Sequence, residues 1–169
     1  ASFIFFDAFK QRLGDGEIDL TTTTGHAFLF RLTNTAPNVD THDDATDQPA
    51  ITGGTYADAA ITHAWAETGA GTGIWRFAAG ADVTWTATGS DFTQAQYVVL
   101  FDDTHAQKAL VGYFSYGSGF TVPTGGTFTL NLDANFPSAY YNDVRLGGEW
   151  MWQNRVAVRA GYRMELNAP

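Results

Sequence analysis

Three sets of residues have the types and spacing for chemistry, and the first is an acidic run. Its carboxylates lie within eight residues of one another: Asp40, Asp43, Asp44 and Asp47. Oxygen ligands of this kind suit a hard cation such as calcium, which takes roughly 6–8 of them. Because the spacing fits no defined calcium loop, we favour a solvated acidic loop and keep the metal site as the minor alternative.

The second set consists of histidines and neighbouring carboxylates. The histidines are spread along the chain, with no two at metal-ligand spacing: His26, His42, His63 and His105. Asp102, Asp103 and His105 imitate part of a hydrolase site, but we expect them on an exposed hairpin tip. The sequence has no Gly-x-Ser-x-Gly elbow, phosphate-binding loop or zinc motif. We therefore expect a protein that is not an enzyme and has no cofactor.

The third set is aromatic and basic. Exposed tryptophans would suit sugar rings, but Trp75 and Trp85 are better explained as core residues because aromatic side chains bury a large area. Tryptophan and arginine are enriched in protein interfaces. Near the C-terminus this predicts a set of contact residues: Tyr141, Trp150, Trp152, Arg155 and Arg159. Charged residues on an edge strand also block aggregation, and we leave this alternative open.

Composition sets the broad class. A chain of 169 residues with 44% hydrophobic residues can build one core, and 18 glycines with 15% aromatics indicate strands and turns. The net charge of −9 would repel phosphate backbones, so we expect no nucleic-acid partner. There is no cysteine, and no apolar run approaches the ~20 residues of a membrane-spanning helix. We expect no membrane partner.

The N-terminal residues 2–13 predict an amphipathic helix. Phe3, Phe6 and Phe9 recur at a spacing of three and form its apolar stripe. Ser2 is expected to cap the helix and Gly14 to end it. The three phenylalanines are candidate contact residues.

The rest of the chain predicts strands. Two apolar runs, Tyr97–Phe101 and Leu110–Phe114, flank the polar residues 102–108, which is typical of a hairpin buried on both faces. Shorter strands are expected over residues 27–32, 57–67, 73–77, 81–86, 120–122 and 127–132. The predicted fold is a mainly β antiparallel sandwich with one N-terminal helix and a C-terminal hairpin.

Charge divides the chain near Asn135. Up to that residue there are 15 acidic against five basic side chains, and after it three acidic against four basic. We interpret residues 1–135 as the body. Residues 136–169 are interpreted as an added hairpin with strands over 143–152 and 155–166.

A family resemblance runs from about Phe3 to Asn135. It is carried by the ordered segments FFDAFKQRLGDGEIDL, FRLTNTAPNVDTHD, DVTWTA, YVVLFDD, LVGYFSYG and FTLNLDAN. Together they resemble small structural proteins of tailed bacteriophages. After Asn135 the chain departs from that pattern and resembles a closing hairpin of an outer-membrane barrel.

The resemblance implies a virion structural protein that decorates or cements a capsid. Its expected partners are the major capsid protein or another virion protein, and further copies of itself as a homo-oligomer. The alternatives are a tail or baseplate component and a carbohydrate-binding adhesin.

Overall fold

The computed structural model describes residues 3–21, 25–67, 69, 71–73, 75–134, 143–152 and 156–165. The first elements are β1 (Phe3–Phe5), α1 (Asp7–Gly14), β2 (Phe28–Thr33), β3 (Ala59–Ile61), β4 (His63–Glu67) and β5 (Trp75–Ala79). They are followed by β6 (Val83–Thr86), β7 (Phe92–Asp102), β8 (Leu110–Val122), β9 (Thr127–Ala134), β10 (Asp143–Trp152) and β11 (Val156–Glu165).

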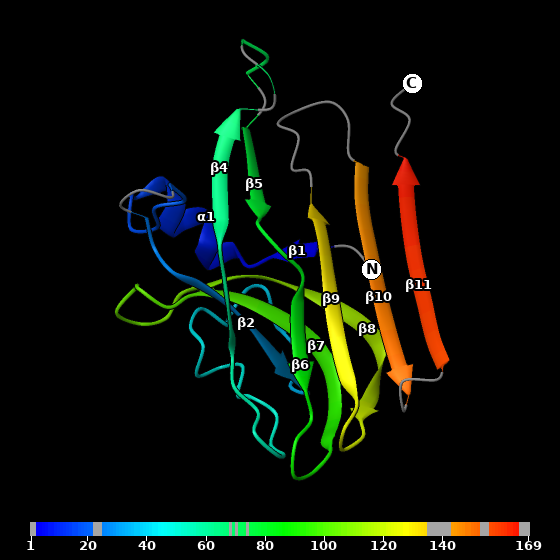
Figure 1. Cartoon of the computed structure of the whole chain (residues 1–169). Helices are drawn as coiled ribbons and strands as arrows, with labels where there is room; N and C mark the ends of the chain where they lie inside the picture. Colours follow the sequence, from blue (N-terminus) through cyan, green and yellow to red (C-terminus); the bar gives the residue numbers. More distant parts are fainter. Residues whose placement is uncertain are drawn as a thin grey trace.

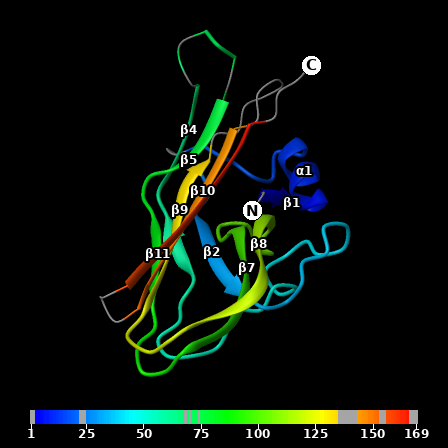
Figure 2. The ribbon, with the colours of Figure 1, turned by 90° about the vertical axis from the view of Figure 1, so that its right-hand side faces the viewer.

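These strands form two stacked antiparallel sheets and a small third one. The five-stranded sheet has the order β1-β8-β7-β2-β3, and the four-stranded sheet has the order β11-β10-β9-β6. Figures 1 and 2 show the two sheets facing each other, with the β4–β5 pair projecting beyond them. The predicted mainly β class with one N-terminal helix is confirmed.

The five-stranded sheet is covered on both faces. Toward the other sheet, Phe30 and Val98 pack in a cluster with Trp85 and Phe128. On the opposite face, Val99 and Phe101 pack with residues of the loop after β2 and of the N-terminal segment. Such two-sided burial explains why the central runs are continuously apolar.

The central hairpin is longer than predicted. The apolar run Leu110–Phe114 is only the start of β8, which continues through Gly117 and includes the separate strand predicted over residues 120–122. Gly117 has a φ of +77°, and the pairing of β8 with β7 is irregular around it. A glycine at a β-bulge lets the strand continue past the irregularity.

The N-terminal helix is shorter than predicted. Residues Phe3–Phe5 form β1, which pairs with β8, and α1 begins at Asp7 after the extended residue Phe6. The prediction of a helix from Ser2 was wrong because pairing with β8 decides the conformation of these residues. The left-handed residue after the helix is Gly16, at a φ of +75°, and not Gly14.

The C-terminal hairpin continues the smaller sheet. Strand β10 pairs with β11 along its length and with β9 from Val144 to Met151.

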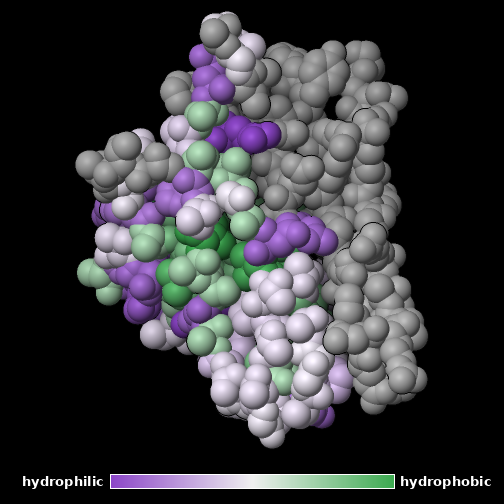
Figure 3. Space-filling model, viewed as in Figure 1, coloured by the Kyte–Doolittle hydropathy of each residue, from purple (hydrophilic) through white to green (hydrophobic). Residues whose placement is uncertain are grey.

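Over the described part of the molecule, Figure 3 shows hydrophobic residues gathered in the middle of the visible face with hydrophilic residues around them.

Candidate functional site

The N-terminal phenylalanines predicted as contacts pack inside the fold. Phe6 is fully buried against Tyr113, and Phe9 is buried with its ring stacked on Phe5. Phe3 is half-buried against Phe114, at 4.7 Å between ring centroids. These side chains hold β1 and α1 on the sheet, so Phe6 and Phe9 present no free contact surface.

The C-terminal candidates are placed only in part. Tyr141 and Arg155 lie outside the described residues. Trp150 and Trp152 stand two positions apart in β10, and Trp150 pairs in register with the core residue Phe128. Their role as contacts stays a prediction.

The arginines of this hairpin differ in the charge of the residues with which they pair. Arg159 pairs in register with Glu149, whereas Arg145 pairs with Asp133 on β9 and with Arg163 on β11. Opposite charges on neighbouring strands at paired positions favour the sheet. The register therefore contains both opposite-charge and like-charge pairs, and the docking role of these arginines stays a prediction.

The acidic loop gathers three of its four predicted carboxylates. One oxygen from each of Asp43, Asp44 and Asp47 lies within 4.8 Å of the others, whereas Asp40 is not part of this group. The backbone amide of Asp40 donates to the side chain of Asn38 at 3.1 Å, in the part of the loop before the cluster.

The clustered carboxylates are already bonded within the loop. Asp47 accepts from the amides of Asp43 and Asp44 at 3.0 and 3.4 Å, and Asp44 accepts from the amide of Thr46 at 2.7 Å. The Thr46 side chain also donates to Asp44 and is the main cause that lowers the pKa of that carboxyl. The guanidinium of Arg12 lies 3.8 Å from Asp43. These contacts explain the acidic run as a turn-forming loop.

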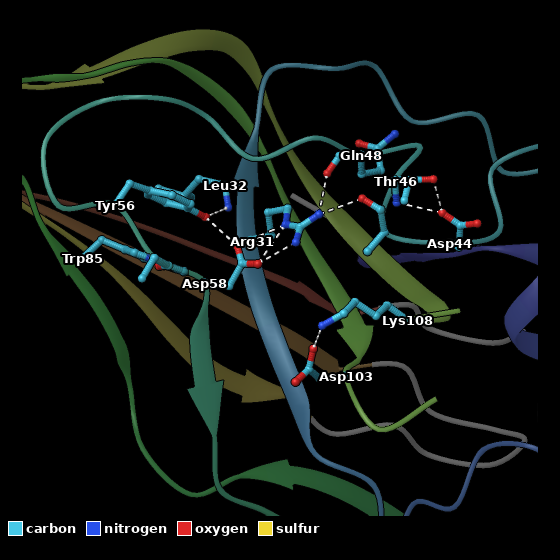
Figure 4. Close-up of polar contacts among 12 residues, drawn as sticks. Arg31, Leu32, Asp44, Thr46, Gln48, Tyr56, Asp58, Trp85, Asp103 and Lys108 are labelled. Atoms are coloured by element: carbon cyan, nitrogen blue, oxygen red, sulfur yellow. Dashed lines mark hydrogen bonds and ion pairs between the residues drawn. The ribbon is translucent and has the colours of Figure 1, made fainter. Parts of the chain in front are cut away.

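Arg31 anchors the long connection between β2 and β3. Its guanidinium forms a two-pronged ion pair with Asp58, with a shortest distance of 2.6 Å, and donates to the carbonyls of Ala45 and Gln48 at 2.7 and 3.1 Å (Figure 4). It also lies 4.8 Å from the ring centre of Phe101. A planar fork with five donors suits this set of acceptors.

Tyr56 completes the anchor. Its hydroxyl accepts from the amide of Leu32 at 2.6 Å and donates to Asp58 at 3.2 Å (Figure 4). Burial raises the pKa of Tyr56 above its ordinary value. The loop is therefore fixed to β2 by a connected, partly buried set of bonds.

Asp102 is the main departure from the sequence prediction. It was expected on a solvent-screened hairpin tip, but it is fully buried. Its carboxylate pairs with the ring of His26 and accepts from the amides of Thr104 and His105 at 2.9 and 3.1 Å. The prediction failed because the segment before β2 covers this end of the sheet.

The hairpin tip is bonded to that covering segment at further points. Asp103 donates its amide to the carbonyl of Ala27, and Ala27 donates to the hydroxyl of Thr104, both at 2.8 Å. The ring of His105 lies 3.4 Å from Glu17. Sequence reasoning missed this arrangement because His26 and Asp102 are 76 residues apart.

The prediction of a core position is confirmed for Trp85, whereas the side chain of Trp75 is not among those that the structure describes. Trp85 is buried, its indole donates to the carbonyl of Ala57 at 3.1 Å, and its ring stacks on Phe128. Trp65 is half-buried in β4. Trp85 is thus a core residue and offers no surface for a sugar.

Comparison with known proteins gives no relative: no family model, no curated protein and no solved structure matches the chain. Among the described residues, no helix is both long enough and apolar enough to cross a membrane.

Proposed function

We propose that this chain is a non-enzymatic structural protein of a tailed-phage particle, most specifically a capsid decoration protein. The observation that carries the proposal is that the segments resembling phage structural proteins build one framework. FFDAFKQRLG runs from the last residue of β1 through α1, YVVLFDD forms the second half of β7, and LVGYFSYG forms the first part of β8. They form the sheet that is buried on both faces.

The polar residues that looked suited to chemistry support the same proposal. Arg31 joins a loop to β2, and Asp102 joins the hairpin tip to the segment before β2. Both act as links between distant parts of the chain. A protein that works by presenting a fixed surface gains from such links, because a rigid surface loses less conformational entropy on binding.

The proposed partner is the major capsid protein or another virion protein, with neighbouring copies of this chain alongside. Trp150, Trp152 and Arg159 remain the proposed contacts, together with Tyr141 and Arg155. A stable attachment would bury roughly 1,200–2,000 Å² in total. A tail or baseplate component is the second candidate, because the same framework and resemblance would serve there.

The test measures where the protein resides and in how many copies. Particles of the phage that encodes the chain are purified, separated into heads and tails, and quantified by mass spectrometry against the major capsid protein. A fixed ratio of about one copy per capsid subunit or per capsomer supports decoration. Copies confined to tails support the second candidate, and absence from particles contradicts both.

A variant tests the contact residues. Trp152→Ala should release the protein from particles while its melting temperature as a free protein stays within a few degrees of the wild type. A variant that remains attached, or one that unfolds, contradicts the assignment of Trp152 as a contact. Binding of the free protein to a glycan array would instead favour the adhesin.

A further inference from the structure

Three of the four histidines gather around one buried carboxylate. His26 pairs with Asp102, and the amide of His105 donates to the same carboxylate. His63, on β4, is close enough for the charge of Asp102 to act on its ring. Their positions in the sequence gave no sign of this cluster, because it is assembled from the segment before β2, the hairpin tip and β4.

The cluster joins the hairpin tip to the segment before β2, described over residues 17–21 and 25–27. The titratable or charged groups facing it come from four elements. They are Arg12 on α1, Glu17, Asp19 and His26 on the segment, His63 on β4, and Asp102, Asp103, His105 and Lys108 at the tip.

The surroundings of His63 disfavour a proton on its ring. Its ring stacks on Phe77 at 4.9 Å and meets Phe28 edge-on at 5.0 Å. Its Nε2 atom is buried and has no hydrogen-bond partner among the described residues. A protonated imidazole carries a donor on both nitrogens, so protonation would bury a donor without an acceptor.

The electrostatic balance at His63 agrees with this geometry. Burial lowers the pKa of His63, and it outweighs the backbone of Thr21 and Leu20 and the charges of Asp102 and Asp19, which act in the opposite direction. With a folded pKa below the ordinary value, the packed form binds fewer protons than the opened form. The packed form therefore has its full stability at pH values above 6.5, the ordinary pKa of histidine. That stability falls as the pH drops below 6.5.

We propose that this cluster is an acid-sensitive clasp, in which protonation of His63 loosens the hairpin tip from the segment before β2. The protonated ring leaves its position between Phe28 and Phe77 and withdraws support from the backbone at Leu20 and Thr21. The pair of His26 with Asp102 opposes this opening, because it joins the same two segments. The clasp is independent of the proposed virion role.

The test is amide hydrogen exchange of the full chain at pH 7.5 and 5.5, corrected for the intrinsic change in exchange rate. The informative amides are those of Asp103, Thr104 and His105, which are bonded across or within the clasp. Their protection should fall by about tenfold at the lower pH, because one proton gives at most tenfold per pH unit and only the unit from 6.5 to 5.5 lies below the ordinary pKa of histidine. The amides of Val98 and Val99 in central β7 serve as the internal reference.

Two variants assign the sensor. His63→Phe keeps a ring between Phe28 and Phe77 and should abolish the loss of protection, whereas His105→Gln should keep it. If His105→Gln or His26→Gln abolishes the loss and His63→Phe does not, His63 is not the sensor and the proposal is wrong. Equal protection of the wild type at both pH values also overturns it.

If His63→Phe does not fold, an NMR titration of the wild type tests the proposal in its place. The ring resonances of His63 should report a neutral imidazole at pH 7 and a midpoint below that of a free histidine. A midpoint at or above the free value contradicts the proposal.

Discussion

At the scale of single residues, the charged side chains of this acidic protein join segments that are distant in sequence. Arg31 is the clearest case, since one guanidinium bonds Asp58 and two loop carbonyls while lying beside Phe101. Both members of the ion pair are mostly buried, at 15% and 17% exposure of their side chains. When one partner of such a buried pair is lost, the protein is destabilised because the other charge stays buried without compensation.

Arg31→Lys tests this role. A lysine keeps the charge but cannot reach Asp58 and both carbonyls at once, so the free energy of unfolding should fall by about 2 kcal/mol. Urea denaturation measures the loss. Lys10→Arg is the matched control, because the pair of Lys10 with Asp7 is exposed and should contribute little. A loss below ~0.5 kcal/mol for Arg31→Lys would show that the fork is not needed.

At the scale of elements, the docking of β1 depends on one glycine in the central hairpin. Gly112 pairs with Phe5, and a Cβ atom at this position would lie 2.5 Å from the ring of Phe3 and 2.6 Å from the carbonyl oxygen of Ile4. A glycine in a strand interior often marks the close approach of another backbone. The aromatic N-terminal segment lies flat against β8 because this position has no side chain.

Gly112→Ala should displace β1. The clash involves backbone as well as a ring, so the expected loss is about 1–3 kcal/mol, with faster exchange of the amides of β1. Gly14→Ala is the matched control, since a Cβ there meets nothing within 4 Å and alanine favours a helix. If Gly112→Ala is as stable as Gly14→Ala and β1 stays protected, the close approach does not restrict this position.

At the scale of the whole molecule, the change in charge near Asn135 does not coincide with an end of the smaller sheet. Val144–Met151 of β10 pair with β9, whose residues Phe128 and Leu130 are buried in the core. The hairpin thus continues a sheet that the body also uses. Removing it would leave β9 as an open edge strand, which is a template for aggregation.

A chain ending at Asn135 tests whether residues 136–169 are an added hairpin or an integral part of the four-stranded sheet. Because β9 would lose its partner, we expect a melting temperature lower by several degrees and a tendency to associate, measured by calorimetry and light scattering. A truncated chain that melts like the full chain and stays monomeric would show that residues 136–169 are a separable extension.

How much could be predicted depends on the range of the interactions. The runs Tyr97–Phe101 and Leu110–Phe114 predicted a hairpin because the turn and the burial pattern are local signals. The spacing of Phe3, Phe6 and Phe9 fits a helix, but Phe3 and Phe5 also alternate as in a strand. Pairing with β8, more than 100 residues away, settled the choice. For the candidate site, the acidic loop was visible in the sequence and the histidine cluster was not.

The sequence by itself determined the class of this protein: alternating and continuous apolar runs, abundant glycine and one short amphipathic segment require an antiparallel β fold. Only the tertiary structure decided that Asp102 is buried, that His26 is its partner and that Phe3–Phe5 is a strand. Local patterns fix which face of an element is apolar, because side chains alternate with the backbone period. Burial and ion pairing depend on which distant segment covers that face, and no local period encodes that segment.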